Sequence, residues 1–391
     1  MCNIELIREA DANARKGKHN YGIKKHDVHA EEDNQKLLED FKNGTYKTSP
    51  YQTFNIWEPK PRTIYRLPYY PDRIAHWAIM LVMEPIWVKS FIPTTYACIK
   101  GRGIHKLVKD LKKVLRHNPE ETKYCLKLDI KKFYPSINHD ILKEIIRRKI
   151  KDPKMLHLLD GIIDSTSGVP IGNYLSQFFA NLYLTYFDHW LKEEIGIKYY
   201  YRYADDIVVL SENKEYLRKI LILIKMYLRQ VLKLEVKSNY QVFEIEERGL
   251  DFVGYVFRHN YIKLRKSIKL NLFKTIHKYK RGKLNDFELD KRLASYGGWS
   301  KYCNSKHLLQ KVETITKVHL SNWWGTQSNI SNFYNKPINL VEIFPHRKYY
   351  QLHFTHNKKP RAVNSKSKLL YRELTQCKLP LNIKIKGNAR T

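Results

Sequence analysis

The sequence predicts an α+β protein in which a small antiparallel sheet, covered by helices on one side, carries a cluster of acids. In residues 122–257, short apolar runs such as KYCLKLDI alternate with amphipathic segments such as HDILKEIIRRKI, the order of a split βαβ sheet. The run KYYYRYADDIVVLS then divides into two strands, as a hairpin does. Asp129 ends one strand and Asp205-Asp206 lie at the hairpin, so this fold would bring acids 76 residues apart together.

Each element has its own local signal. AEEDNQKLLEDFKNG has helical spacing and ends on a glycine that suits a helix C-cap. We expect short strands broken by prolines in 51–70, and helices over 72–92 and 104–116. The remaining expected elements, in chain order, are a strand at 123–130, helices at 139–150, 173–195 and 214–232, hairpins at 198–211 and 249–266, and mainly helix over 267–304.

The charge of the chain indicates a polyanionic partner. Its 391 residues hold 71 Lys and Arg against 39 Asp and Glu, a net charge of +32. Residues 255–391 hold 29 Lys and Arg and 6 Asp and Glu, so +23 of this charge lies in the last third. A merely solubilising surface predicts no such asymmetry, whereas nucleic acid is the commonest partner of a strongly basic protein.

The sequence argues against a secreted, a membrane-spanning and a zinc-binding protein. The five cysteines show no C-x-x-C pair, which argues against a disulfide framework or a zinc site. The charged first residues do not resemble a signal peptide. The most apolar segment, IAHWAIMLVMEPIWV, is too short and too polar to span a bilayer. We therefore expect a cytoplasmic protein without a membrane partner.

The acids of the hairpin need a cation. Asp205 and Asp206 stand between tyrosines and the apolar run 207–210, where two neighbouring carboxylates repel each other and are costly to desolvate. An isolated Asp-Asp pair is most often a solvated turn, but this pair has apolar neighbours on both sides. With Asp129, the acids match the arrangement in which two Mg²⁺ ions about 4 Å apart promote phosphoryl transfer.

Several ordered motifs resemble those of reverse transcriptases of the bacterial, group II intron-like branch. YADD resembles the Y-x-D-D motif, LKLDIKKFYPSINHDIL the first catalytic motif, GVPIGNYLSQFFANLYL the next, and RGLDFVGYVF the primer grip. KPRTIYRLPYYPDRIAHWAI resembles the fingers and RLASYGGWSKYCNSKHLLQKV the start of the thumb, so the resemblance covers roughly residues 55–310.

The resemblance implies a right-hand polymerase fold of fingers, palm and helical thumb. The implied domains are a helical N-terminal extension (1–50), fingers (51–122), palm with the catalytic hairpin and primer grip (123–262), thumb (263–320) and a basic, aromatic-rich C-terminal extension (321–391). In that extension, Trp323, Trp324 and Tyr334 would either stack on single-stranded nucleic acid or form a small core.

The same resemblance implies roles for site residues. Asp129 and Asp205, with the carbonyl of Ile130, become ligands of two Mg²⁺ ions, for which Mn²⁺ could substitute, and Asp206 becomes an accessory acid. The implied nucleotide-binding residues are Lys60 and Arg62 at the triphosphate, Tyr134 as steric gate under the sugar, and Ile171, Gly172 and Gln177 in the second motif; Gly254 lies in the primer grip.

Four of these roles have ordinary alternatives. Phe133 could take the place of Tyr134, the two cations near Pro59 and Pro61 could be solvated, and Gln177 could be a helix-surface residue. Lys237 is nearest to the general-acid lysine of the family, but the register there is not fixed by the sequence and a solvated strand lysine explains it better.

The resemblance implies an RNA-directed DNA polymerase that uses deoxynucleotides and makes cDNA on an RNA template. Ile171 replaces the glutamine of the common P-Q-G sequence, and isoleucine there recurs in diversity-generating and related unclassified bacterial enzymes. We expect a structured non-coding RNA as template and a role in antiphage defence. The alternatives are a diversity-generating enzyme that needs a small basic accessory protein, and a catalytically silent RNA-binding protein on a polymerase fold.

Overall fold

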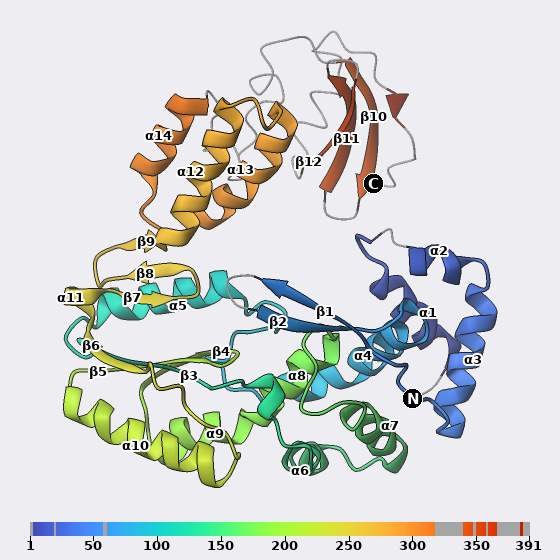
Figure 1. The fold of residues 1–391 in the computed structure, drawn as a ribbon, viewed down its shortest axis with the longest axis horizontal. Helices are drawn as coiled ribbons and strands as arrows, with labels where there is room; N and C mark the ends of the chain where they lie inside the picture. Colours follow the sequence, from blue (N-terminus) through green and yellow to red (C-terminus); the bar gives the residue numbers. More distant parts are fainter. Residues whose placement is uncertain are drawn as a thin grey trace. The chain divides into compact units, whose positions relative to one another are not determined.

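The computed structural model describes residues 3–18, 21–57 and 61–316, and beyond them the backbone of the strands 339–346, 349–356, 359–365 and 384–385. The chain divides into two compact units, Met1–Val253 with Phe257–Asn260, and Gly254–Val256 with Tyr261–Thr391. Both units contain helices and largely antiparallel strands, so the α+β class predicted from the sequence is confirmed (Figure 1). Among the described residues, no helix has the length and apolarity needed to cross a membrane.

A four-stranded antiparallel sheet forms the centre of the first unit, in the order β4-β5-β3-β6. Its strands are β3 (Tyr124–Asp129), β4 (Tyr199–Tyr203), β5 (Asp206–Ser211) and β6 (Gln241–Glu244). Because β5 lies between β3 and β4 and opposes both, β3 and β4 run in the same direction, which is the predicted split βαβ arrangement. The register pairs Asp129 with Asp206 at one end of the sheet.

Helices pack on the face of this sheet that carries Leu126, Leu128 and Val209. They are α6 (His139–Lys149), α8 (Tyr174–Tyr183), α9 (Thr185–His189) and α10 (Lys214–Gln230), with α7 (Pro153–Ile163) beyond them (Figure 1). The sequence predicted a single helix over 173–195. That prediction is wrong in part, because the helix is interrupted at Leu184 (φ −97°, ψ 0°) and a π-helical turn, Trp190–Glu194, follows α9.

Helices cover both faces of the sheet, which corrects the expectation of a one-sided cover. Tyr201, Val208 and Leu210 point to the second face, and each is at most 4% exposed. On that side the ring of Tyr96 stacks at 6.5 Å on Tyr201, and its hydroxyl bonds to Asp110 of α5 (Ile104–His117). Figure 1 shows α5 and α10 on opposite sides of the sheet. The continuous burial of β4 and β5 follows from this two-sided packing.

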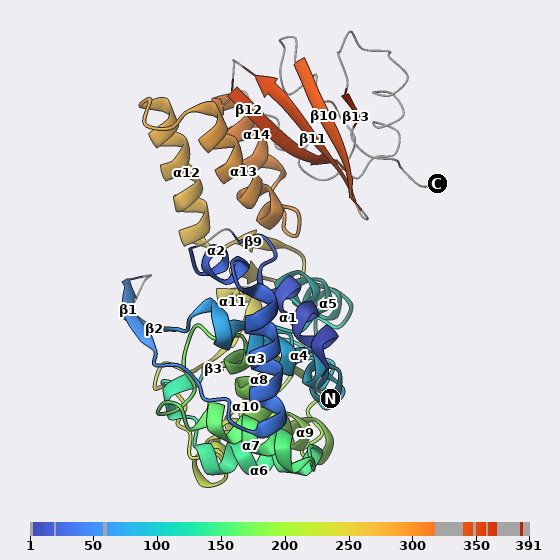
Figure 2. The same cartoon turned by 90° about the vertical axis from the view of Figure 1, so that its right-hand side faces the viewer.

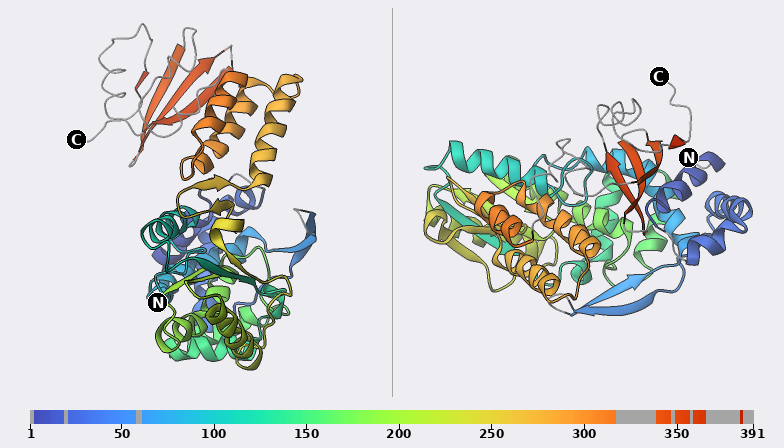
Figure 3. Two further views of the ribbon diagram at one scale, coloured as in Figure 1. Left: turned by 90° about the vertical axis from the view of Figure 1, so that its left-hand side faces the viewer. Right: turned by 90° about the horizontal axis from the view of Figure 1, so that it is seen from above.

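The N-terminal helices form a smaller core with α4 (Ile74–Val88). They are α1 (Ile4–Ala14), α2 (Tyr21–Asp27) and α3 (Ala30–Asn43), and α3 ends at Gly44, whose φ of 70° is the predicted glycine C-cap. The antiparallel pair β1 (Gln52–Trp57) and β2 (Pro61–Arg66) stands out from the body of this unit (Figures 2 and 3). Nearly all its side chains are exposed.

The remaining elements of the first unit are α11 (Ile245–Arg248) and β7 (Leu250–Phe252). The chain then continues into β8 (Tyr255–Phe257) and, in the second unit, β9 (Ile262–Leu264) and the helices α12 (Lys266–Lys280), α13 (Asp286–Ser300) and α14 (Lys306–Thr316). Leu272, Leu293 and Val312 lie in the common core of these helices, as the helical prediction required.

Four strands follow in the second unit, in the order β12-β11-β10-β13. They are β10 (Asn339–His346), β11 (Tyr349–His356), β12 (Lys359–Ser365) and β13 (Lys384–Ile385). The sequence did not predict this sheet. Trp323, Trp324 and Tyr334 lie outside the described residues.

Candidate active site

Asp129, Asp205 and Asp206 all lie at one end of the central sheet. Asp129 is the last residue of β3, and Asp206, the first residue of β5, is its cross-strand partner. Tyr203 pairs with Asp206, so Ala204 and Asp205 form a two-residue turn that closes the β4–β5 hairpin. Ala204 has a φ of 54°, in the left-handed region that alanine seldom adopts. This turn places Asp205 beside Asp129, as the sequence predicted.

The carboxylates of Asp129 and Asp205 form a negatively charged cluster that a cation would stabilise. Burial, followed by the negative charge of Asp129, raises the pKa of the Asp205 carboxyl to about 7. Asp129 Oδ1 is buried, and no hydrogen-bond donor of the described residues reaches it. A buried oxygen without a donor and a second carboxylate that repels it fit the preference of hard divalent cations for oxygen ligands.

The described residues do not form a complete metal cage from side chains alone. No three His, Cys, Asp or Glu side chains in that part of the chain converge on one point. The residues that fit a divalent cation are therefore Asp129 and Asp205. The carbonyl of Ile130 is the predicted further ligand, while Asp206 contributes its charge to the neighbourhood of Asp205.

Lys237 also belongs to this cluster. Residues 235–237 pair with 129–131 beyond the regular strands: the Lys131 amide donates to the Glu235 carbonyl at 2.7 Å and the Lys237 amide to the Asp129 carbonyl at 2.8 Å. The ammonium of Lys237 then donates to Asp129 Oδ2. A lysine that the sequence left as a solvated strand residue thus pairs with the first catalytic-motif acid.

Comparison with protein families shows which family this chain belongs to. Residues 58–257, just over half of the chain, match the family described as reverse transcriptase (RNA-dependent DNA polymerase). The chain belongs to the reverse transcriptase family. All three acids and Lys237 lie within the matched residues, and the family predicted from the sequence motifs is confirmed. Reverse transcriptases as a family generally depend on a divalent metal ion.

Several relatives match part of this chain. The chain is 28% identical to protein YkfC of Escherichia coli (strain K12), over 41% of this chain and 45% of that protein. It is 27% identical to the group II intron-encoded protein LtrA of Lactococcus lactis subsp. cremoris, over 40% of this chain and 28% of LtrA. These matches thus span less than half of either relative.

A longer match is to the retron Ec73 reverse transcriptase of Escherichia coli, with 26% identity over 66% of this chain and 86% of that protein. Among solved structures, telomerase from Candida albicans in complex with a fragment of telomeric RNA aligns with 74% of this chain and 58% of its own. That alignment has a TM-score of 0.48 and 12% identity.

The second motif packs against the first and against the projecting hairpin. The Val169 amide donates to the Tyr134 carbonyl at 2.9 Å, and the Tyr65 amide of β2 donates to the Ile171 carbonyl at 2.8 Å. Gly172 has a φ of 124°, and a Cβ there would stand 2.6 Å from the Tyr65 carbonyl oxygen. Only glycine permits this close approach, so Gly172 fixes the base of the hairpin at the site.

The two aromatic residues predicted as candidates for the steric gate differ in burial. Phe133 is 2% exposed and packs in the core of the first unit, whereas Tyr134 is only partly buried. Burial, together with the nearby charges of Cys98 and Asp205, raises the pKa of the Tyr134 hydroxyl above its ordinary value. Tyr134 is therefore the aromatic side chain within electrostatic reach of the acids.

The other predicted site residues lie on β2, on α8 and in the second unit. Arg62 lies exposed on β2 opposite Ile56, Gln177 lies exposed on α8, and Lys60 lies outside the described residues. Gly254 belongs to the second unit, where its φ is 88° and a Cβ would stand 2.5 Å from the Trp299 ring. Trp299 thus requires glycine at this position, which the sequence did not reveal.

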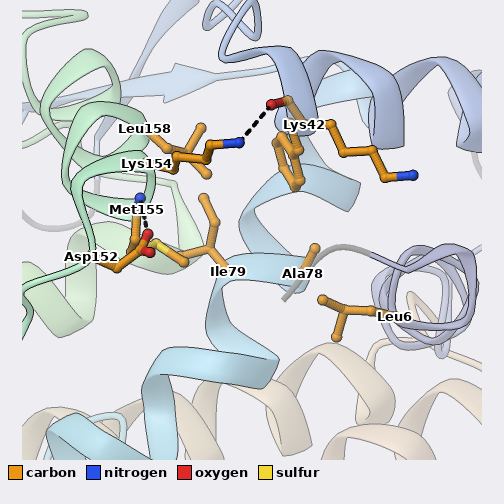
Figure 4. A pocket seen from close by; sticks show the side chains of 9 residues that line it. Leu6, Lys42, Ala78, Ile79, Asp152, Lys154, Met155 and Leu158 are labelled. Carbon is orange, nitrogen blue, oxygen red and sulfur yellow. Dashed lines mark hydrogen bonds between the residues drawn. The ribbon is translucent and has the colours of Figure 1, made fainter.

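A pocket of the first unit lies away from this site. About 320 Å³ in volume, it lies where α1, α3, α4 and α7 meet, and is lined by apolar groups such as Ile79, Met155 and Leu158 (Figure 4). Lys154 Nζ bonds across it to the Lys42 carbonyl at 3.3 Å. None of the three acids lines it.

Proposed function

We propose that this chain is an RNA-directed DNA polymerase that extends a DNA strand by nucleotidyl transfer on an RNA template. The observation that carries the proposal is the meeting of Asp129 and Asp205, with a buried oxygen that has no donor and a carboxyl whose pKa burial and repulsion raise. Two repelling carboxylates are costly for folding, and a divalent cation offsets that cost.

In the proposed mechanism, Asp129 and Asp205 hold two Mg²⁺ ions, with the Ile130 carbonyl as a further ligand; Mn²⁺ is the alternative ion. When bound, such ions activate the attacking 3′-hydroxyl and neutralise the leaving pyrophosphate. Lys237 lies beside Asp129 and balances part of the negative charge of the cluster. Asp206, the first residue of β5, adds to the negative charge of the cluster.

The nucleotide would lie between Tyr134 and the second motif. Tyr134, held through its carbonyl by Val169, would face the sugar and exclude a 2′-hydroxyl. Arg62 and Lys60 would contact the triphosphate, since an exposed guanidinium on a projecting hairpin suits multidentate phosphate binding. Ile171 offers an apolar side chain where many relatives of this family offer a hydrogen-bonding one, so selection there would depend on shape.

The proposed template is a dedicated structured non-coding RNA, and the proposed biological role is antiphage defence. The match to a retron reverse transcriptase over 86% of that protein supports a compact enzyme of this kind. A diversity-generating enzyme that works with a small basic protein is the alternative proposal. Genomic neighbours separate the two, since template and variable repeats beside the gene would indicate the diversity-generating enzyme. Sequencing the RNA that co-purifies with the protein tests the template: one fixed RNA species is expected, and a mixture of cellular RNAs would contradict a dedicated template.

The activity itself is tested by primer extension on an RNA template with deoxynucleotides and Mg²⁺. We expect DNA synthesis by the wild type and by Glu212→Gln, which alters an exposed carboxylate close in sequence to the hairpin. Asp205→Asn should make no product. Equal synthesis by Asp205→Asn, or none by the wild type while it retains RNA, would contradict the proposal and favour a catalytically silent RNA-binding protein.

A further inference from the structure

A fully buried guanidinium lies beneath the turn that carries Asp205. Arg202, three residues before that acid on β4, is 0% exposed, as is its main partner Asp188 of α9. Nε of Arg202 lies 2.8 Å from Asp188 Oδ1, and Nη2 lies 2.5 Å from Oδ2. Nη1 donates to two further acceptors, the side-chain oxygen of Asn181 at 3.1 Å and the main-chain carbonyl of Ala204 at 3.0 Å.

The surroundings leave this guanidinium little freedom. Asp188 also accepts hydrogen bonds from the Tyr200 hydroxyl at 2.6 Å and the Thr95 hydroxyl at 3.0 Å. Asn181 is held in turn, because its amide donates to the Ala97 carbonyl at 2.8 Å. Groups from two helices, a strand and a loop therefore fix one planar donor, and bidentate pairing gives that donor a defined orientation.

The bond to Ala204 acts on the geometry of the acid that follows. The Ala204 carbonyl belongs to the peptide unit that joins Ala204 to Asp205, and this unit is planar. Fixing its oxygen fixes the orientation of the whole peptide plane, and so the direction in which the Asp205 side chain leaves the turn. Ala204 lies in the left-handed region at φ 54°, which is sterically strained for alanine. Without this hydrogen bond, the strain would favour a change in the backbone of the turn.

Asp205 also has an electrostatic reason to move. Its carboxylate lies beside that of Asp129, and repulsion between the two groups opposes their close approach. Arg202 does not neutralise this repulsion from a distance, because Asp188 already pairs with its charge. What the guanidinium supplies to the turn is the directed hydrogen bond to the Ala204 carbonyl.

We propose that Arg202 is a positioning residue that holds the Ala204–Asp205 peptide so that the Asp205 carboxylate stays beside Asp129. This inference rests on the proposed function, because it takes Asp205 to be a ligand of a divalent cation. Asp188 and Asn181 hold the guanidinium in place and do not touch the reacting groups. The rival account is that the Arg202–Asp188 pair serves only to stabilise the fold.

The variant Arg202→Lys separates the two accounts. Lysine keeps a positive charge opposite Asp188. Its single ammonium lacks the planar fork of donors, so it cannot pair with Asp188 and the Ala204 carbonyl together. We expect a folded protein with a thermal midpoint near that of the wild type. Binding of Mn²⁺, measured by titration calorimetry without nucleotide, should weaken about three- to tenfold for the loss of one directed hydrogen bond.

A second variant covers the case in which lysine does not fit. Arg202→Gln combined with Asp188→Asn removes both charges, so no buried charge is left unpaired. The asparagine oxygen can still accept from one of the hydroxyls of Tyr200 and Thr95, while its amide donates to the other. The shorter glutamine does not reach Ala204. This double variant should fold and show the same loss of Mn²⁺ affinity. Unchanged Mn²⁺ binding in either folded variant would overturn the proposal, as would unfolding of both, since the pair would then serve the fold.

A further measurement distinguishes failure of this proposal from failure of the proposed function. If Asp205→Asn binds Mn²⁺ as the wild type does, Asp205 is no metal ligand and the proposed function fails. Hydrogen exchange of the backbone amides in residues 203–206 then tests Arg202 independently. Faster exchange in Arg202→Lys than in the wild type supports the positioning role, and equal exchange contradicts it.

Discussion

The ammonium of Lys237 donates to the carboxylate of Asp129 across 108 residues of sequence. The main chain brings them together, because the Lys237 amide also donates to the Asp129 carbonyl at 2.8 Å. Asp129 therefore has a resident cation on Oδ2, while its Oδ1 is buried without a donor. The two oxygens of one carboxylate thus have different environments, and an added metal ion would share Asp129 with a lysine.

Replacing Lys237 by methionine should tighten the binding of a divalent ion. Without the ammonium, Asp129 has both oxygens available and no positive charge competes with the metal. We expect the dissociation constant of Mn²⁺, measured by titration calorimetry, to fall about two- to fivefold, the range of a partly exposed ion pair. Lys131→Met is the matched control, since it removes an exposed lysine paired with Glu235. Equal or weaker Mn²⁺ binding by Lys237→Met would contradict this role.

Replacing Asp205 by asparagine should stabilise the metal-free protein. The wild-type side chain is buried beside Asp129, and the amide removes the repulsion that raises its pKa. We expect the free energy of unfolding in chelator to rise by about 1–2 kcal/mol. Denaturant titration measures this, with Glu212→Gln as an exposed control that should leave stability unchanged. A less stable Asp205→Asn would mean that the carboxylate is favourably paired without metal.

Replacing Gly172 by alanine should disturb the base of the β1–β2 hairpin. The new Cβ would stand 2.6 Å from the Tyr65 carbonyl oxygen, and its φ of 124° is strained for any other residue. We expect a loss of about 1–3 kcal/mol in the free energy of unfolding. Gly161→Ala is the contrasting control, because that glycine lies inside α7 with nothing within 4 Å of the added methyl. It should stabilise the protein slightly, and equal effects of both changes would contradict the packing described here.

The N-terminal helices should lose stability as the pH rises. Burial of His26 lowers its pKa, but hydrogen bonds to Asp11 and Asp33 outweigh this and raise the pKa overall. A raised pKa means that the folded state binds the proton more tightly than the unfolded state. The stability that protonated His26 adds is therefore fully present below about pH 6.5 and is lost as the pH rises through the folded-state pKa. His26→Gln should reduce the fall in thermal midpoint between pH 6 and pH 9. The exposed His29→Gln should not, and identical pH profiles in wild type and His26→Gln would contradict the assignment.

Short apolar runs and their order along the chain were enough to predict that the acids lie close together. Asp129 ends an apolar strand and the Asp-Asp pair opens another, so antiparallel pairing places Asp129 opposite Asp206. The turn chemistry of the YADD sequence then sets Asp205 beside them. These features depend on local pattern and regular pairing, which a sequence displays directly.

The side chains that support the acids could not be predicted in the same way. Lys237 reaches Asp129 through an isolated bridge outside the regular strands, and no periodic pattern marks such a pairing. Arg202 shows one signal, a lone cation among tyrosines in a buried strand, but its partners come from a loop and two helices whose packing is tertiary. The cover on the second face of the sheet was missed for the same reason, since α5 lies before β3 in the chain.

The most direct test of the central claim is a comparison of RNA-templated primer extension by Asp129→Asn, Asp205→Asn and the double variant. If the two acids form one cation site, each single change removes it. Each should then lower the rate by at least about a thousandfold, and the double variant should lose little more. Losses that multiply in the double variant, or DNA synthesis by Asp205→Asn at the wild-type rate, would contradict the account.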